Sequence, residues 1–141
     1  MNDQRNISLG EIGQISVNVH DFDRAVAFYK DTLGIKHLFT VAGRMAFFDC
    51  CGIRLMLAIP ERPDLDHPSS ILYFKVADID QAHEALVSRK VHFETKPMLV
   101  APMATHDLWL AELRDSENNV LGLMCETEAG ETLGMRRCTR P

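Results

Sequence analysis

The chain repeats a strand-to-helix junction, and this repeat limits its fold more than any other feature. Residues 19–25 read VHDFDRA and residues 76–82 read VADIDQA, so the second copy follows the first by 57 positions without a gap. The valine, both aspartates and the alanine recur, with a bulky apolar residue between the aspartates. A spacing of this size is longer than the period of most solenoid repeats. The pattern therefore predicts two copies of one supersecondary module within 141 residues, the length of one ordinary domain.

In each copy, a strand pattern comes before the junction and a helix pattern follows it. Residues 14–19 and 71–76 alternate with period two, which is typical of strands with one buried face. Asp21 and Asp78 stand where each helix would begin and can act as N-caps. Gly34 suits the position just past the end of the first helix. Further strands are predicted at residues 37–41, 45–50, 53–59, 91–94, 107–114 and 120–126.

The order of elements is therefore βαβββ, twice, which predicts an α+β fold with mixed sheets. The domain is expected to span residues 1–126, with the first module at residues 11–60 and the second at residues 69–126. Residues 61–68 contain two prolines and form the linker between the modules. Residues 127–141 form a polar C-terminal tail, whose role the sequence does not indicate.

The composition is that of a soluble protein that does not bind nucleic acid. Lys and Arg number 15 against 20 Asp and Glu, which gives a net charge of −5. A phosphate backbone would need a basic face instead. No apolar run is long enough to span a membrane, and the first ten residues do not have the pattern of a signal peptide. The expected location is cytoplasmic, where Cys50, Cys51, Cys125 and Cys138 would be reduced.

Three stretches carry a resemblance to a known family. They are residues 12–34, which end in FYKDTLG, residues 47–57 and residues 106–115. Together with the duplication, they resemble the vicinal oxygen chelate superfamily, which includes glyoxalase I, bleomycin-resistance proteins and extradiol dioxygenases. The resemblance covers roughly residues 11–126. It implies that the paired βαβββ modules curve into a half-barrel cleft, and that two copies of the chain form a homodimer with modules side by side or exchanged. The apolar loop predicted at residues 96–105 is a candidate lid or dimer contact.

In members of that superfamily that use a metal, each module supplies one ligand from its first strand and one from its last. The matching positions here are Gln14, Met56 with its neighbour Leu55, Ile71 and Gly122. Glutamine serves in some glyoxalase I enzymes, but isoleucine and glycine cannot bind a metal, and a thioether prefers soft metals. A catalytic site needs about three protein ligands. We therefore expect no cofactor at these positions, and the sequence leaves a divalent metal elsewhere open.

The same alternation predicts which side chains line the cleft. The expected ligand-binding residues are Gln14, Ser16, Asn18, Arg54, Met56, Ile71, Tyr73, Trp109, Gly122 and Met124. Arg54 can hold a carboxylate or phosphate by two parallel hydrogen bonds, or it can pair internally with Asp49 or Glu126. The methionines and the tyrosine offer adaptable apolar surface. This lining favours a metal-independent binder of a small acidic or aromatic molecule.

His106 supports the alternative of an enzyme. As a general base it would suit a lyase, an isomerase or a dioxygenase-like enzyme. Asp107 and Trp109 would leave a regular strand on the face opposite to His106, so neither forms a ready-made pair with it. His20 follows the first strand and is expected at the surface. Relocated metal ligands, if there are any, would come from His92, His106, Asp107, Cys50 and Glu126.

Overall fold

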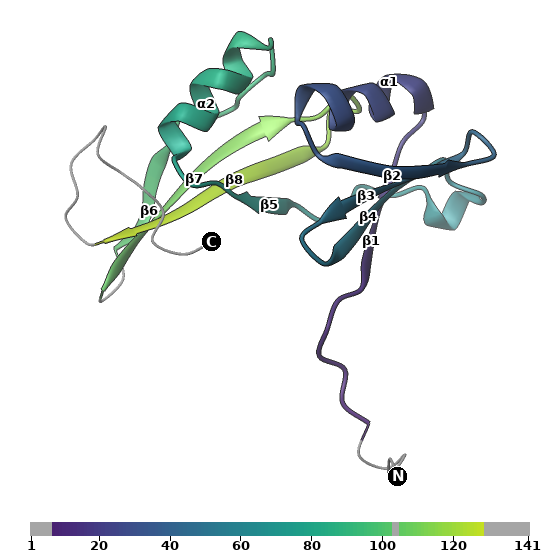
Figure 1. Cartoon of the computed structure of the whole chain (residues 1–141), viewed down its shortest axis with the longest axis horizontal. Helices are drawn as coiled ribbons and strands as arrows, with labels where there is room; N and C mark the ends of the chain where they lie inside the picture. The colour runs from purple at the N-terminus through teal and green to yellow at the C-terminus, as the bar shows by residue number, and fades with distance from the viewer. Residues whose placement is uncertain (1–6, 103–104, 129–141) are drawn as a thin grey trace.

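The computed structural model describes residues 7–102 and 105–128, and it has two modules with the same order of elements (Figure 1). The first contains β1 (Gln14–Asn18), α1 (Phe22–Ala27), the π-helical turn η2 (Phe28–Thr32), β2 (Lys36–Val41), β3 (Met45–Cys50) and β4 (Ile53–Ala58). The second contains β5 (Leu72–Lys75), α2 (Ile79–Ser88), β6 (Met98–Pro102), β7 (His106–Arg114) and β8 (Val120–Glu128). A 3-10 turn, η3 (Pro63–Leu65), lies in the linker. The predicted α+β fold of two βαβββ modules is confirmed.

Each module forms its own four-stranded mixed sheet. The strand orders are β1-β4-β3-β2 and β5-β8-β7-β6. In both sheets the first strand runs parallel to the last, and the other pairs are antiparallel. Figure 1 shows α1 and α2 on the same side of the two sheets. Among the described residues, the opposite side of each sheet carries no α-helix, and we call it the open face.

The core lies between the helices and the sheets. Val17, Phe48 and Leu57 of the first sheet are buried on the α1 side, and Leu113 and Leu121 occupy matching places in the second sheet. Burial of each side chain of this size stabilises the fold by about 1.5–3 kcal/mol. The apolar half of the strand alternation thus packs under the helices, and its polar half is left for the open face.

Both predicted N-caps form. The Asp21 side chain accepts a hydrogen bond from the backbone N–H of Arg24, and Asp78 accepts one from the N–H of Gln81. Each cap of this kind stabilises its helix by about 1 kcal/mol. Gly34 has a φ of +73°, a conformation that glycine adopts without strain. The two N-caps and the glycine conformation are therefore as the local sequence predicts.

The predicted strand at residues 91–94 is wrong. There Phe93 makes only an isolated bridge to Leu113, and the second strand of the second module is β6. The predicted loop at residues 96–105 therefore contains a strand, which pairs antiparallel with β7 through a bulge between Leu99 and Ala101. Because β6 is an edge strand, one side of its backbone needs no partner, and an edge position tolerates Pro102.

Further expectations concern the C-terminal tail and the thiols. The first two residues of the predicted tail, residues 127–128, belong to β8, and residues 129–141 lie outside the described residues. Cys50 and Cys51 are free, but Cys125 is disulfide-bonded, so the prediction of a reduced thiol is wrong there. None of the described helices combines the length and the apolar character needed to cross a membrane. The cytoplasmic location stays a prediction.

Candidate functional site

The open face of the first sheet places five of the predicted ligand residues side by side. The register puts Gln14 beside Arg54 and Ser16 beside Met56, and Asn18 ends the same row of β1. Directly opposed residues of neighbouring strands present their side chains on one face. Gln14, Ser16 and Arg54 are exposed there, in agreement with the alternation. Their binding of a ligand stays a prediction.

Arg54 is held in place without a carboxylate partner. Its Nε donates a 3.0 Å hydrogen bond to Oε1 of Gln14, and its guanidinium carbon lies 5.3 Å from the centre of the Phe47 ring. The other end of the Gln14 amide contacts Sδ of Met56 at 3.9 Å. Within residues 7–102 and 105–128, no ion pair involves Arg54. A cation is therefore fixed on the open face by an amide and an aromatic ring.

Asp49 is one of the two internal partners that the sequence offers to Arg54. It stands opposite Arg54 in the register of β3 and β4. Its Oδ1 instead accepts a 3.3 Å hydrogen bond from the backbone N–H of Gly52, in the turn that follows. The Asp49 carboxylate thus stabilises the hairpin turn, and the Arg54 guanidinium can still bind an acidic group.

A cavity of about 340 Å³ lies at the end of this face, between the sheet and the linker. Ser16, Asn18 and Met56 line it from β1 and β4, and Leu65 and His67 line it from the linker. Nδ2 of Asn18 donates to the backbone oxygens of Leu65 and His67 and so ties the linker to the end of β1. The volume falls within the usual range for small-molecule pockets.

Except for Trp109, the predicted residues of the second module lie on the open face of the other sheet. Tyr73 stands opposite Gly122 and Lys75 opposite Met124, and Ile71 immediately precedes β5. A Cβ atom on Gly122 would lie 2.3 Å from Cδ1 of Tyr73, so only glycine allows the ring to lie there. None of the predicted residues of the second module lines the cavity beside Asn18.

Trp109 lies away from the other predicted ligand residues. It stands opposite buried Cys125 on the α2 side of the second sheet, where it packs against the core. Its Nε1 donates a 3.1 Å hydrogen bond to Oγ1 of buried Thr127. The structure therefore packs a partly buried Trp109 against the core, on the face opposite to Gly122.

His106 and Asp107 separate as the strand alternation predicts. Asp107 is buried, whereas His106 is only partly buried and its Nδ1 lies 2.7 Å from Oγ1 of Thr105. His92 forms a separate surface group in which its Nε2 lies 3.3 Å from Oε1 of Glu94. The hydrogen bond from Arg114 is the main cause of the lowered pKa of Glu94. These histidines are not brought to one site.

The donor set does not fit the metal of the superfamily. Oε1 of Gln14 accepts a hydrogen bond from Arg54, so a positive charge stands against the one oxygen donor at these positions. The ring of Tyr73 covers Gly122, which has no side chain to offer. In the described part of the chain, no three His, Cys, Asp or Glu side chains are grouped so that they could hold a metal ion. The superfamily positions therefore do not supply the three protein ligands that a catalytic metal site needs.

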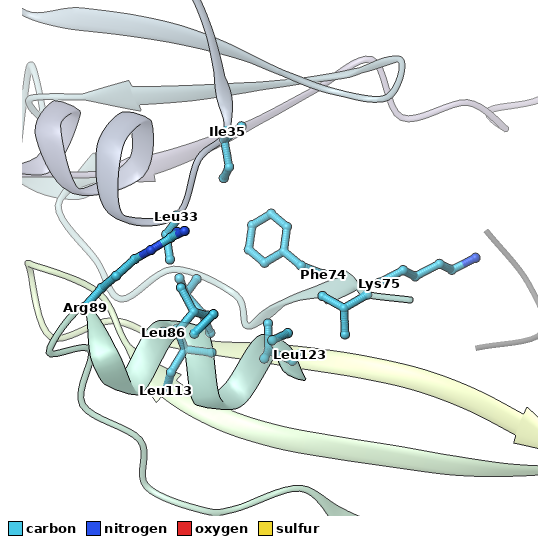
Figure 2. A pocket seen from close by; sticks show the side chains of 12 residues that line it. Leu33, Ile35, Phe74, Lys75, Leu86, Arg89, Leu113 and Leu123 are labelled. Carbon is cyan, nitrogen blue, oxygen red and sulfur yellow. The ribbon is translucent and has the colours of Figure 1, made fainter. Parts of the chain in front are cut away.

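A further cavity, of about 310 Å³, lies at the boundary between the modules on the α2 side (Figure 2). Ile35 comes from the first module, and Phe74 and Leu86 come from the second. Arg89 borders the cavity, and its Nη1 donates a 2.8 Å hydrogen bond to the backbone oxygen of Thr32 across the boundary. The walls are mostly apolar, and none of the ten predicted ligand residues lines this cavity.

Comparison with known proteins agrees with this architecture. Solved structures with the same fold include a lactoylglutathione lyase from Agrobacterium tumefaciens, with 20% identity, a TM-score of 0.66 and coverage of 82% of this chain and 93% of that one. A virulence protein from Salmonella typhimurium has 17% identity, a TM-score of 0.68 and coverage of 84% and 98%, respectively. A superfamily member from Sphaerobacter thermophilus has 19% identity, a TM-score of 0.68 and coverage of 82% and 97%.

At such identities these likenesses show the fold alone, whereas the family match rests on the sequence. The model of the Glyoxalase/Bleomycin resistance protein/Dioxygenase superfamily matches residues 11–121, most of the chain. This is the superfamily that the duplicated modules and the FYKDTLG stretch resemble. The chain therefore belongs to the Glyoxalase/Bleomycin resistance protein/Dioxygenase superfamily.

Proposed function

We propose that the chain binds a small acidic molecule, without a metal, on the open face of the first sheet. The observation that carries the proposal is the exposed guanidinium of Arg54, which Gln14 and Phe47 orient and which forms no ion pair with a carboxylate of the described residues. Among those residues, neither terminal nitrogen of Arg54 donates a hydrogen bond. These two nitrogens are the pair that can hold a carboxylate by parallel hydrogen bonds.

The surroundings of Arg54 suit a ligand that also has an apolar or aromatic part. Phe47 stacks on Phe39, with ring centres 4.6 Å apart, and Phe39 is 44% exposed. Met56 lies beside them and lines the cavity next to the linker. Aromatic rings and a flexible thioether give contact area that adapts to the shape of a ligand. An aromatic carboxylate therefore matches both the charge and the apolar surface.

The proposal includes a homodimer. Besides Phe39, the exposed apolar side chains include Ile71 and Tyr73, at 44% each, and Met98 at 53%. Exposed apolar surface of this extent often marks a protein–protein interface. Pairing of two chains would also bring an open face of one against the other. Sedimentation velocity at several concentrations tests this part, and a monomer at all of them would contradict it.

The binding test compares aromatic carboxylates with their neutral amides, for example benzoate with benzamide, by isothermal titration calorimetry. We expect binding of the carboxylate, no binding of the amide, and no effect of a metal chelator. Loss of charge-assisted hydrogen bonds in Arg54→Gln should weaken the affinity by about ten- to a hundredfold. Arg62→Gln, which removes an exposed arginine paired with Asp64, is the matched control. Equal affinities of the two variants would overturn the proposal.

The alternative is a lyase, an isomerase or a dioxygenase-like enzyme in which His106 is the base. His106 is accessible on β7, but Asp107 is buried and so does not pair with it on one face. The carboxylate recovered after binding should therefore be unchanged. Chemical conversion that is lost in a folded His106→Ala variant would establish the enzyme instead.

A further inference from the structure

We propose that His20 bridges Asp66 and Glu117 and thereby holds in place residues 65–67, the linker wall of this site. We also propose that the affinity for the acidic ligand falls when His20 loses its proton. This proposal rests on the proposed function, because the linker wall borders the cavity at the end of the open face that carries Arg54. Its first part, the positioning of the linker, does not depend on any ligand and can be measured without one.

The bridge joins three segments that are distant in the sequence. His20 follows β1, Asp66 follows η3 in the linker, and Glu117 lies in the turn between β7 and β8. Nε2 of His20 lies 3.0 Å from Oδ1 and 3.1 Å from Oδ2 of Asp66. Nδ1 lies 3.1 Å from Oε1 of Glu117. Each nitrogen of the ring therefore faces a carboxylate.

This arrangement needs the protonated ring. A neutral imidazole has one N–H, so its other nitrogen would present a lone pair to an anion, whereas an imidazolium donates from both nitrogens. The hydrogen bond and charge of Asp66, with a smaller contribution from Glu117, raise the pKa of His20 above its ordinary value of 6.5. The bridge is complete below that ordinary value and is lost as the pH rises through the raised pKa.

Loss of the proton should release Asp66 and leave Glu117 in place. Glu117 also accepts hydrogen bonds from the backbone N–H groups of His20 and Asp21, at 2.6 and 3.0 Å, and its side chain is only 10% exposed. The side chain of Asp66 is 46% exposed, and His20 is its one partner among the described residues. The weaker of the two anchors is therefore the one on the linker.

The linker segment that Asp66 holds is a wall of the candidate site. Asp66 stands between Leu65 and His67, and both of these line the cavity of about 340 Å³. Asn18 holds the backbone oxygens of the same two residues. Without the bridge from His20, Asn18 would be the remaining side-chain anchor of this wall within the described structure. A looser wall forms fewer stable contacts with a bound molecule.

Other charged groups face the same region and are already engaged. Arg114, from β7, donates to Oε1 of Glu94 and to the backbone oxygen of Asn118. Asp21 caps α1, and Asp115 accepts hydrogen bonds within its own turn. Nδ1 of His67 lies 3.1 Å from the backbone oxygen of Pro68. None of these groups contacts the ring of His20, so the two bridging carboxylates dominate its surroundings.

The test begins with an NMR pH titration of the ligand-free protein between about pH 6 and about pH 9, a range that covers a raised histidine pKa. We expect the Leu65 methyl and Asn18 side-chain amide signals to follow the titration of the His20 ring. They should become insensitive to pH in His20→Gln and in Asp66→Asn. Asp64→Asn removes a linker carboxylate that pairs with Arg62 and should keep the wild-type titration. The same curves in wild type and His20→Gln would overturn the positioning role.

The second readout is the affinity for benzoate, which stays ionised throughout this range. For the wild type and Asp64→Asn, we expect the affinity to be about two- to fivefold weaker at the highest pH of this range than at the lowest. The loss of an exposed ion pair implies a change of this size. The affinity should not change with pH in His20→Gln or Asp66→Asn. Failure of benzoate to bind, with the linker titration intact, would reject the proposed function and keep the positioning role. Binding without pH dependence in the wild type would overturn the coupling.

Discussion

The hydroxyl of Tyr29 donates a 2.6 Å hydrogen bond to Oδ2 of Asp115, and this bond joins the helical segment of one module to a turn of the other. Both residues are buried, and burial together with the Asp115 carboxylate raises the pKa of Tyr29. Oδ1 of Asp115 also accepts from the backbone N–H groups of Glu117 and Asn119. The turn that presents Glu117 to His20 is therefore held by the same Asp115 carboxylate that connects the two modules.

Tyr29→Phe should destabilise the protein by about 1.5–3 kcal/mol, because it leaves a buried carboxylate without one of its donors. The measurement is urea denaturation of wild type and variant at neutral pH. Tyr73→Phe is the matched control, since the Tyr73 ring is 44% exposed and its hydroxyl has no hydrogen bond among the described residues. That control should change the stability by less than about 0.5 kcal/mol. Equal losses in both variants would contradict the importance of the Tyr29–Asp115 bond.

Gly122→Ala should destabilise the second sheet by about 1–3 kcal/mol, as is usual for overpacking. The new Cβ would lie 2.3 Å from Cδ1 and 2.6 Å from Cε1 of Tyr73, so the ring would have to move. A second substitution, Tyr73→Ala, removes the clash and should recover much of the loss. Urea denaturation of the single and double variants measures this coupling. Purely additive effects would show that the ring does not lie over Gly122.

Cys51 should react with iodoacetamide faster than Cys50 at neutral pH. Burial, with a contribution from Asp49, raises the pKa of the Cys50 thiol, so less of it is present as the reactive thiolate. Cys51 is exposed in the turn between β3 and β4. Timed alkylation followed by peptide mass spectrometry gives both rates. The rates should become similar in urea, and equal rates in the native protein would contradict the burial of Cys50.

Short-range patterns in the sequence predict the frame of this fold well. Alternation identifies the face of the first sheet that carries Gln14 and Arg54, because successive side chains of a strand point to opposite faces of the sheet. Asp21 and Asp78 mark the helix starts, because a cap acts within three residues of itself. The sequence does not reveal β6, because Pro102 argues against a strand unless that strand lies at an edge, and edge position is a property of the whole sheet.

The contacts of the candidate site depend on long-range geometry and were not predictable in the same way. His20 meets Asp66 across 46 positions and Glu117 across 97, so its local sequence indicated only an exposed residue. The partner of Arg54 likewise depends on the fold, because the turn at Gly52 engages the Asp49 carboxylate. A duplicated pattern fixes each module, but the contacts between modules follow from how the two pack together.

The last prediction concerns metal binding, and we expect no stoichiometric metal at the superfamily positions. Incubation with nickel, zinc, iron or manganese, followed by desalting and elemental analysis of tag-free protein, measures this directly. The reason is electrostatic and chemical: Arg54 places its charge against Oε1 of Gln14, and Gly122 offers no donor. One metal per chain that is lost in Gln14→Ala would show that the guanidinium moves away and that the superfamily site forms. A metal that survives Gln14→Ala but is lost in His106→Ala would instead locate relocated ligands and favour the enzyme.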